Sequence, residues 1–150
     1  MNQTDAFLQM WRESRTRFSL LLNGINENQL RYTLEPSANS AGFLIRHIAD
    51  VEKLFSKNVF GKADVKVVAK TVIDKKDTGE HTDLSFLLSY QNESSEDLAS
   101  AIALQSDSDW SQTIETKEFG VKTKAEALGR ITSHTAYHAG QLALILKYGK

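Results

Sequence analysis

The sequence predicts an all-α protein that folds as a four-helix bundle, and three observations support this prediction. Apolar residues recur at helical spacing in four segments, with little sign of strands elsewhere. A connection of about twenty residues separates the second and third segments, which is long enough to cross a bundle. The 150 residues, 41% of them hydrophobic, suffice for one buried core but not two, so residues 1–150 are expected to form one domain.

The first helix is predicted within residues 4–25. Its apolar stripe consists of Phe7, Trp11, Phe18, Leu21, Leu22 and Ile25. Thr4 is the expected N-cap and Gly24 the expected stop. Residues 26–40 are polar and hold the only proline, so they are expected to form an irregular connection in which a short turn docks Leu30.

The second helix is predicted over residues 41–60, capped by Asn39 or Ser40. Its stripe consists of Leu44, Ile48, Val51, Leu54 and Phe55. At 100° per residue, His47 falls inside the same arc, so its imidazole is expected to point toward the core.

The connection over residues 62–83 carries turn-forming residues without a helical period. A structureless segment of this length is uncommon unless it travels the length of a bundle or covers a site. We therefore expect it to join two parallel helices. The third helix is predicted to follow over residues 83–105, capped by Thr82 or Asp83.

Residues 106–123 are expected to form a loop or a small hairpin that Trp110 pins to the bundle. The fourth helix is predicted to begin near Lys124 and to run almost to residue 150. Its core stripe consists of Leu128, Ile131, Ala139, Leu142, Ile145 and Leu146. His138 lies within this stripe and His134 just beside it.

Composition excludes several classes of partner and site. Eighteen basic and nineteen acidic residues give a net charge of −1, which argues against nucleic acid and anionic membranes as partners. No apolar run approaches a membrane span and the N-terminus does not resemble a leader, so a cytoplasmic protein is expected. The absence of cysteine excludes disulfides and thiolate ligands, so any metal must be held by nitrogen and oxygen.

Two histidines spaced i and i+4 on one helix, His134 and His138, can chelate one divalent ion. The alternative is that His134 is partly exposed and His138 bonds a carbonyl at the core edge. His47 adds a third core-facing imidazole, and convergence of all three on one ion would satisfy them together. Separate hydrogen bonds to hydroxyls such as those of Thr135 and Tyr137 remain open as an alternative.

The segments "LIRHIADVEKLF" and "HTAYHAGQLALIL" resemble the DinB-like family of metalloenzymes, in which three histidines match in identity, helix and order. The resemblance covers essentially the whole chain. It implies an up-down-down-up bundle with a long crossover between helices two and three, and a divalent metal held by His47, His134 and His138. Family members commonly pair as dimers, so a homodimer is expected.

A three-histidine site suits zinc, nickel, copper or iron(II) and leaves a coordination position open for water or a small-molecule substrate. The Glu-x-x-His pairs of di-iron bundles, the HExxH motif and glycine-rich phosphate loops are absent. The resemblance implies an S-transferase or isomerase that uses a low-molecular-weight thiol such as bacillithiol or mycothiol, or a hydrolase. The alternative is a non-catalytic bundle whose histidines bind metal or a small ligand to stabilise or regulate a dimer. Metal affinity is expected to fall as the pH drops through about 6.

Several polar residues near these histidines are candidates for supporting roles. Gln141 lies one turn beyond His138 and could orient a ligand or lie at an exposed rim. Glu52 and Asp50 could act as a general base or remain solvated helix charges. Tyr137 could hydrogen-bond in the pocket or fill an interface. His81, in the connection before the third helix, is a further candidate ligand.

Overall fold

Four long helices make up most of the computed structural model, which describes residues 1–150. They are α1 (Gln3–Ser19), α2 (Ala41–Asn58), α4 (Leu84–Ala103) and α5 (Lys124–Tyr148). The short elements are the 3-10 turns η1 (Leu20–Leu22), η2 (Glu27–Arg31) and η3 (Asp107–Ser111), the helix α3 (Lys70–Asp74) and the strands β1 (Thr113–Thr116) and β2 (Gly120–Thr123). None of the helices is long and apolar enough to span a membrane.

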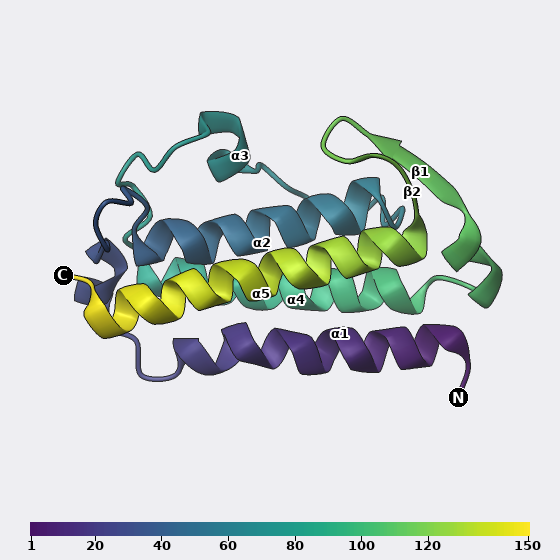
Figure 1. Cartoon of the computed structure of the whole chain (residues 1–150), viewed down its shortest axis with the longest axis horizontal. Helices are drawn as coiled ribbons and strands as arrows, with labels where there is room; N and C mark the ends of the chain where they lie inside the picture. Colours follow the sequence, from purple (N-terminus) through teal and green to yellow (C-terminus); the bar gives the residue numbers. More distant parts are fainter.

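The long helices pack so that α2 and α1 each contact both α4 and α5. Figure 1 shows α1 and α5 running in one direction and α2 and α4 in the other. Contacts between α2 and α4 agree with a parallel pair, because Asp50 bonds Tyr90 and Lys53, one turn later, bonds Asp97. The long connection therefore returns the chain to the end at which α2 begins.

The predicted caps of α2 and α4 are present, and that of α1 is wrong. The side chains of Ser40 and Asp83 accept hydrogen bonds from the first turns of α2 and α4. Asn2 caps α1 instead of Thr4. The Thr4 hydroxyl accepts a hydrogen bond from the Trp110 indole at 2.8 Å, so Trp110 anchors the segment after α4 as predicted.

Residues 113–123 form a two-stranded antiparallel hairpin, one of the two alternatives expected for residues 106–123, so the mostly helical fold also contains a small sheet. Gly120 has a φ of 70°, a left-handed conformation that glycine adopts without steric cost, and it turns the chain into β2. Phe119 in the turn packs against Phe55 of α2 with ring centroids 6.0 Å apart. This contact holds the hairpin over the side of the bundle formed by α2 and α5 (Figure 1).

The prediction that residues 62–83 lack a helix is also wrong, because α3 forms within them. The Thr71 backbone N–H and hydroxyl both donate to the buried carboxylate of Asp50, at 3.0 and 2.8 Å. Gly42 permits a second close approach, since a side chain there would collide with the His81 carbonyl oxygen. These contacts hold this connection against α2.

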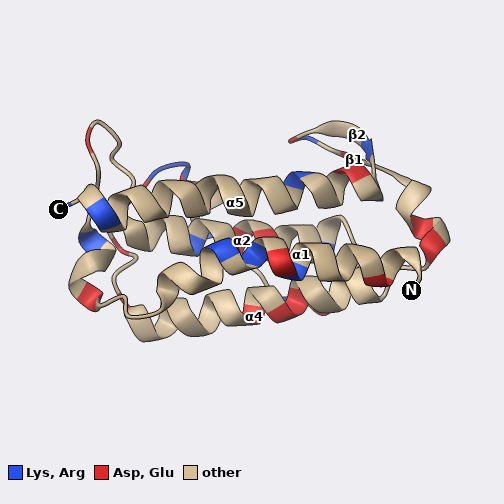
Figure 2. Cartoon of the chain, turned by 60° about the horizontal axis from the view of Figure 1, so that its bottom comes forward, with Lys and Arg blue, Asp and Glu red and all other residues tan.

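The core consists of two apolar clusters, one toward each end of the bundle. Trp11, Phe55, Trp110 and Leu128 belong to the first cluster, and Phe18, Leu44, Leu87 and Leu142 to the second. Five charged side chains are buried, those of Arg15, Arg46, Asp50, Glu52 and Lys53. In Figure 2, acidic and basic segments of α1, α2 and α4 lie near the middle of these helices. Because the apolar packing is divided in this way, α2 carries both core and polar contacts.

Candidate metal centre

Three imidazoles converge between α2 and α5. His47 from α2 and His134 and His138 from α5 each present a ring nitrogen, and these nitrogens lie within 4.8 Å of one another. The Nε2 atoms of His47 and His134 are 3.3 Å apart. Two nitrogens on a tetrahedral zinc ion, with bonds of about 2.0–2.1 Å, would be separated by about 3.3 Å. The spacing of this pair therefore fits a shared divalent ion.

A buried hydrogen-bond chain orients the His47 ring. The Thr71 hydroxyl donates its single hydrogen to Asp50 at 2.8 Å, so its oxygen accepts from Nδ1–H of His47 at 3.0 Å. This assignment of the tautomer leaves the His47 Nε2 lone pair free, aimed at the other two histidines. Thr71 was not predicted from the sequence to support the site.

Asp50 is fully buried, so the expectation of a solvated helix charge is wrong for it. Its Oδ1 accepts hydrogen bonds from Arg46 at 2.8 Å and from the Tyr90 hydroxyl at 2.7 Å. Burial raises the pKa of Tyr90 and the hydrogen bond to Asp50 raises it further, so Tyr90 remains a donor. Asp50 therefore anchors the chain that ends at His47.

The two histidines of α5 differ in their partners. Gln141 lies one turn beyond His138, and its Oε1 accepts from Nδ1 of His138 at 2.7 Å, which leaves the His138 Nε2 free to bind a metal. Nδ1 of His134 is buried and has no hydrogen-bond partner. Without an ion, the close Nε2 pair of His47 and His134 would be the only polar contact of the His134 ring. The donor set therefore fits a metal better than separate hydrogen bonds.

All three histidines are held in the neutral form that metal binding requires. Burial lowers the pKa of His47 to about 4, the nearby His138 lowers it too, and Asp50 partly opposes the shift. Burial also lowers the pKa of His134 to about 3, with smaller contributions from the other two histidines and Arg130. Burial lowers the pKa of His138 as well, against the effect of Gln141. Protons should therefore compete with a metal for the folded site only at a pH below the value of about 6 that was expected from the sequence.

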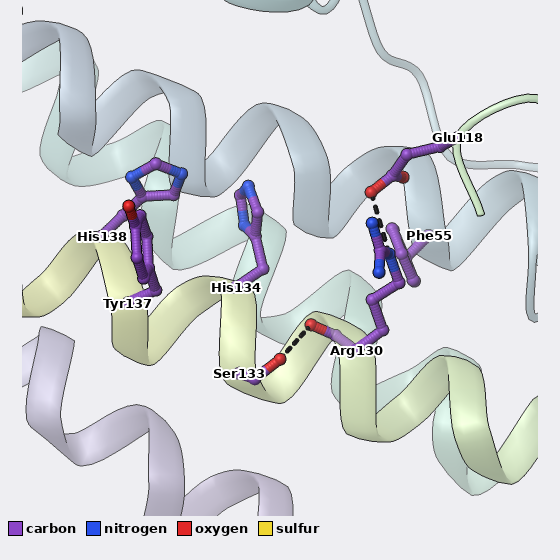
Figure 3. Close-up of a pocket in the computed structure, with 7 residues that line it drawn as sticks. All are labelled: Phe55, Glu118, Arg130, Ser133, His134, Tyr137 and His138. Carbon is purple, nitrogen blue, oxygen red and sulfur yellow. Dashed lines mark hydrogen bonds and ion pairs between the residues drawn. The ribbon is translucent and has the colours of Figure 1, made fainter.

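Open cavities flank the histidines. One, of about 380 Å³, is lined by Phe55, Glu118, Arg130, Ser133, His134, Tyr137 and His138 (Figure 3). A second, of about 360 Å³, borders His47 and His134 and shares Glu118 and Phe55 with the first. Glu118, from the hairpin turn, is the one carboxylate that lines either cavity. Its place in the cavity was not predicted, because no local sequence pattern indicates which α5 residues a hairpin turn will reach.

The remaining candidates lie at different distances from the histidines. Glu52 is fully buried rather than solvated, and it bonds Arg15, Ser94 and Thr135 with no contact to an imidazole. Tyr137 is exposed, and its ring stacks edge-on against His138 at 5.2 Å. His81 is buried but lies outside the three-histidine group, with the Phe43 ring contacting both it and His47.

A helical bundle with three inward-facing histidines indicates a metal-binding class of protein. Comparison of the sequence with known families identifies the family. A family model of the DinB superfamily matches residues 10–142, so the chain belongs to that superfamily. No curated protein matches the sequence significantly.

Two of the solved structures with a similar fold are forms of one enzyme. The mycothiol-dependent maleylpyruvate isomerase aligns with a TM-score of 0.68 at 18% identity over 93% of this chain. A histidine-to-alanine variant of that enzyme aligns with a TM-score of 0.65 at 17% identity, also over 93% of this chain. This chain spans 60% of the length of each of those chains. At this identity the likeness shows a shared fold.

Proposed function

We propose that this protein is a divalent-metal-dependent enzyme in which His47, His134 and His138 hold the ion and a small thiol is the co-substrate. The observation that supports this most directly is the convergence of three neutral imidazoles beside an open cavity. Three protein ligands and an open side are typical of catalytic rather than structural sites. A sealed site would instead have favoured the non-catalytic alternative.

The proposed metal supplies one kind of chemistry, which is to lower the pKa of a thiol or a water that binds it. The protein contains no cysteine, so a thiol nucleophile must come from a co-substrate. The dependence of the isomerase with the similar fold on mycothiol supports a thiol over water, and hydrolysis is the second candidate reaction. Zinc, nickel, copper and iron(II) all suit these ligands.

The residues of the chain have separate roles in this proposal. Thr71 and Asp50 hold the tautomer of His47, and Gln141 holds that of His138. Glu118 faces both cavities from the hairpin turn, where it can take up or release a proton beside a bound substrate. Phe55 supplies an apolar wall that limits the access of water.

We further infer that the four long helices form the up-down-down-up bundle of the family. The helix directions in Figure 1 support this inference, as does the connection that runs the length of α2. A cytoplasmic homodimer stays part of the proposal, and size-exclusion chromatography with light scattering tests its oligomeric state.

The test of the proposed function is turnover by metal-loaded protein. Protein loaded separately with zinc, nickel or iron(II) would be mixed with bacillithiol, mycothiol, glutathione or cysteine and an electrophilic acceptor, and thioether formation would be followed by mass spectrometry. A parallel panel of esters and amides tests hydrolysis. We expect turnover with at least one thiol and one metal. His134→Ala should abolish it.

A measurement of thiol binding tests the choice of co-substrate separately from turnover. In Co²⁺-loaded protein, a thiolate ligand produces a charge-transfer absorption that a water ligand lacks. Appearance of this band on thiol addition, with its loss in His134→Ala, would support the thiol hypothesis before any acceptor is known. Metal binding without a thiolate band and without turnover of either panel would refute the proposed enzyme.

A further inference from the structure

Arg130 extends the row of side chains that α5 directs toward the candidate metal centre. Arg130, His134 and His138 are spaced four residues apart and project to the same side of the helix (Figure 3). Residues one turn apart on a helix are separated by about 6 Å along its axis. A group bound to Arg130 would therefore lie about one turn from the histidines, within the same cavity.

The guanidinium of Arg130 is only partly engaged. Its Nε donates to Oε1 of Glu118 at 3.1 Å, and its two terminal amino groups have no protein acceptor. Both side chains are about half exposed, at 42% and 52%, so the ion pair is accessible from solvent. Surface ion pairs of this kind contribute little to the stability of a fold, so a ligand can displace Glu118 at small cost.

The charge of the cavity also favours an anion. The three histidines are neutral ligands, so they do not cancel the charge of a divalent ion. Glu118 is the only acidic residue of the cavity and its carboxylate already lies on Arg130. The carboxylate of Glu118 therefore shows, within the protein itself, the kind of group that fits beside the Arg130 guanidinium.

We propose that Arg130 is a substrate-binding residue that recognises a carboxylate of the acceptor substrate, and that Glu118 occupies this position until the substrate displaces it. A carboxylate is favoured because it matches the planar fork of arginine, with two parallel hydrogen bonds. This inference rests on the proposed function in that the ligand is a substrate of the metal centre.

The experiment uses benzoate as the probe and benzamide as its uncharged match, because the cavity is lined in part by the aromatic rings of Phe55 and Tyr137. Affinities are measured by NMR titration of the full chain after chelator treatment, and again after zinc loading. The first condition detects binding that is independent of a metal, and of turnover. The variants are Arg130→Gln, Arg130→Lys and Glu118→Gln. Lys62→Gln and Asp64→Asn serve as controls in an ion pair outside the cavity.

Substitutions of Arg130 and of Glu118 are expected to change the affinity for benzoate in opposite directions. Arg130→Gln should weaken benzoate binding about tenfold, with Arg130→Lys intermediate. Glu118→Gln should strengthen it about two- to fivefold, because the internal competitor is lost. Benzamide binding and the control variants should show no such changes. Both substitutions break the same ion pair, so loosening of the hairpin alone would shift both affinities in the same direction.

Several results would overturn this inference. They are no measurable benzoate binding to the unaltered protein, equal binding of benzoate and benzamide, or Arg130 and Glu118 variants that change together or not at all. Because these measurements require neither thiol nor turnover, the inference can fail while the proposed enzyme stands. Conversely, an inactive protein that binds benzoate through Arg130 would refute the proposed function and retain the carboxylate site.

Discussion

Thr71→Val is the sharpest test of the hydrogen-bond chain behind His47. Valine has nearly the shape of threonine and keeps the backbone N–H that donates to Asp50. The substitution therefore removes two hydrogen bonds, those of 3.0 Å from His47 and 2.8 Å to Asp50, with little change in side-chain volume. Asp50 keeps Arg46, Tyr90 and the residue 71 backbone N–H as donors, so it stays paired. His47 loses the acceptor that fixes its tautomer.

The loss should appear mainly in metal affinity. Removing such a partner of a histidine ligand typically weakens metal binding by about 10–100-fold, which corresponds to about 1.4–2.7 kcal/mol. The metal-free protein should also lose about 1–3 kcal/mol of unfolding free energy, because buried polar groups lose a partner. Competition between the protein and a chromophoric zinc chelator measures the first quantity, and urea unfolding in EDTA measures the second.

Thr135→Val is the matched control. Thr135 is a buried threonine that donates to another buried carboxylate, Glu52, at 3.2 Å, and its side chain does not bond a histidine. It should lower the unfolding free energy without a comparable loss of metal affinity. Equal zinc affinity of Thr71→Val and the unaltered protein, or an equal loss in Thr135→Val, would refute the role assigned to Thr71.

Three further predictions concern ligands, acid and the buried ion pair. His134→Ala should lose the metal that elemental analysis finds in unsupplemented protein, whereas retention of metal would refute the three-histidine site. In metal-free protein, the pKa values of His47 and His134 lie at about 4 and about 3, below their ordinary value of 6.5. The unfolded chain therefore binds more protons between these values, so the unfolding free energy should be greatest above about pH 6.5 and fall as the pH drops toward 4. Urea titrations across this range check the slope, which should be smaller in His47→Phe. Glu52→Gln should destabilise the fold by about 3–5 kcal/mol, because Arg15 would lose its buried partner, and an unchanged zinc affinity would separate Glu52 from the metal site.

The long helices were predictable because their stripes and caps are local. Ser40 and Asp83 lie where a side chain can cap the following helix. Leu44, Ile48 and Val51 repeat at helical spacing. The helix α3 was not predictable, since its five residues are too few to display a period. Its position depends on Asp50, which lies 21 residues away in sequence.

The candidate site was predictable in part for the same reason. His134 and His138 are related by helical spacing, and the core-facing position of His47 follows from its own stripe. The burial of Asp50 and Glu52 could not be predicted, because it depends on partners that are distant in sequence. These are Thr71 and Tyr90 for Asp50, and Arg15 for Glu52. Glu118 reaches the cavity only through the path of the hairpin, which no local pattern specifies.

The separation of the histidines along the chain has a consequence for folding kinetics. His47 and His134 are 87 residues apart, so their contact closes a long loop. Contacts of such long range form only after loop-closure entropy has been overcome, and therefore late in folding. An ion that binds the completed site should slow unfolding while leaving the refolding rate almost unchanged. The rate at which the metal dissociates would then determine how long the native state persists before it unfolds.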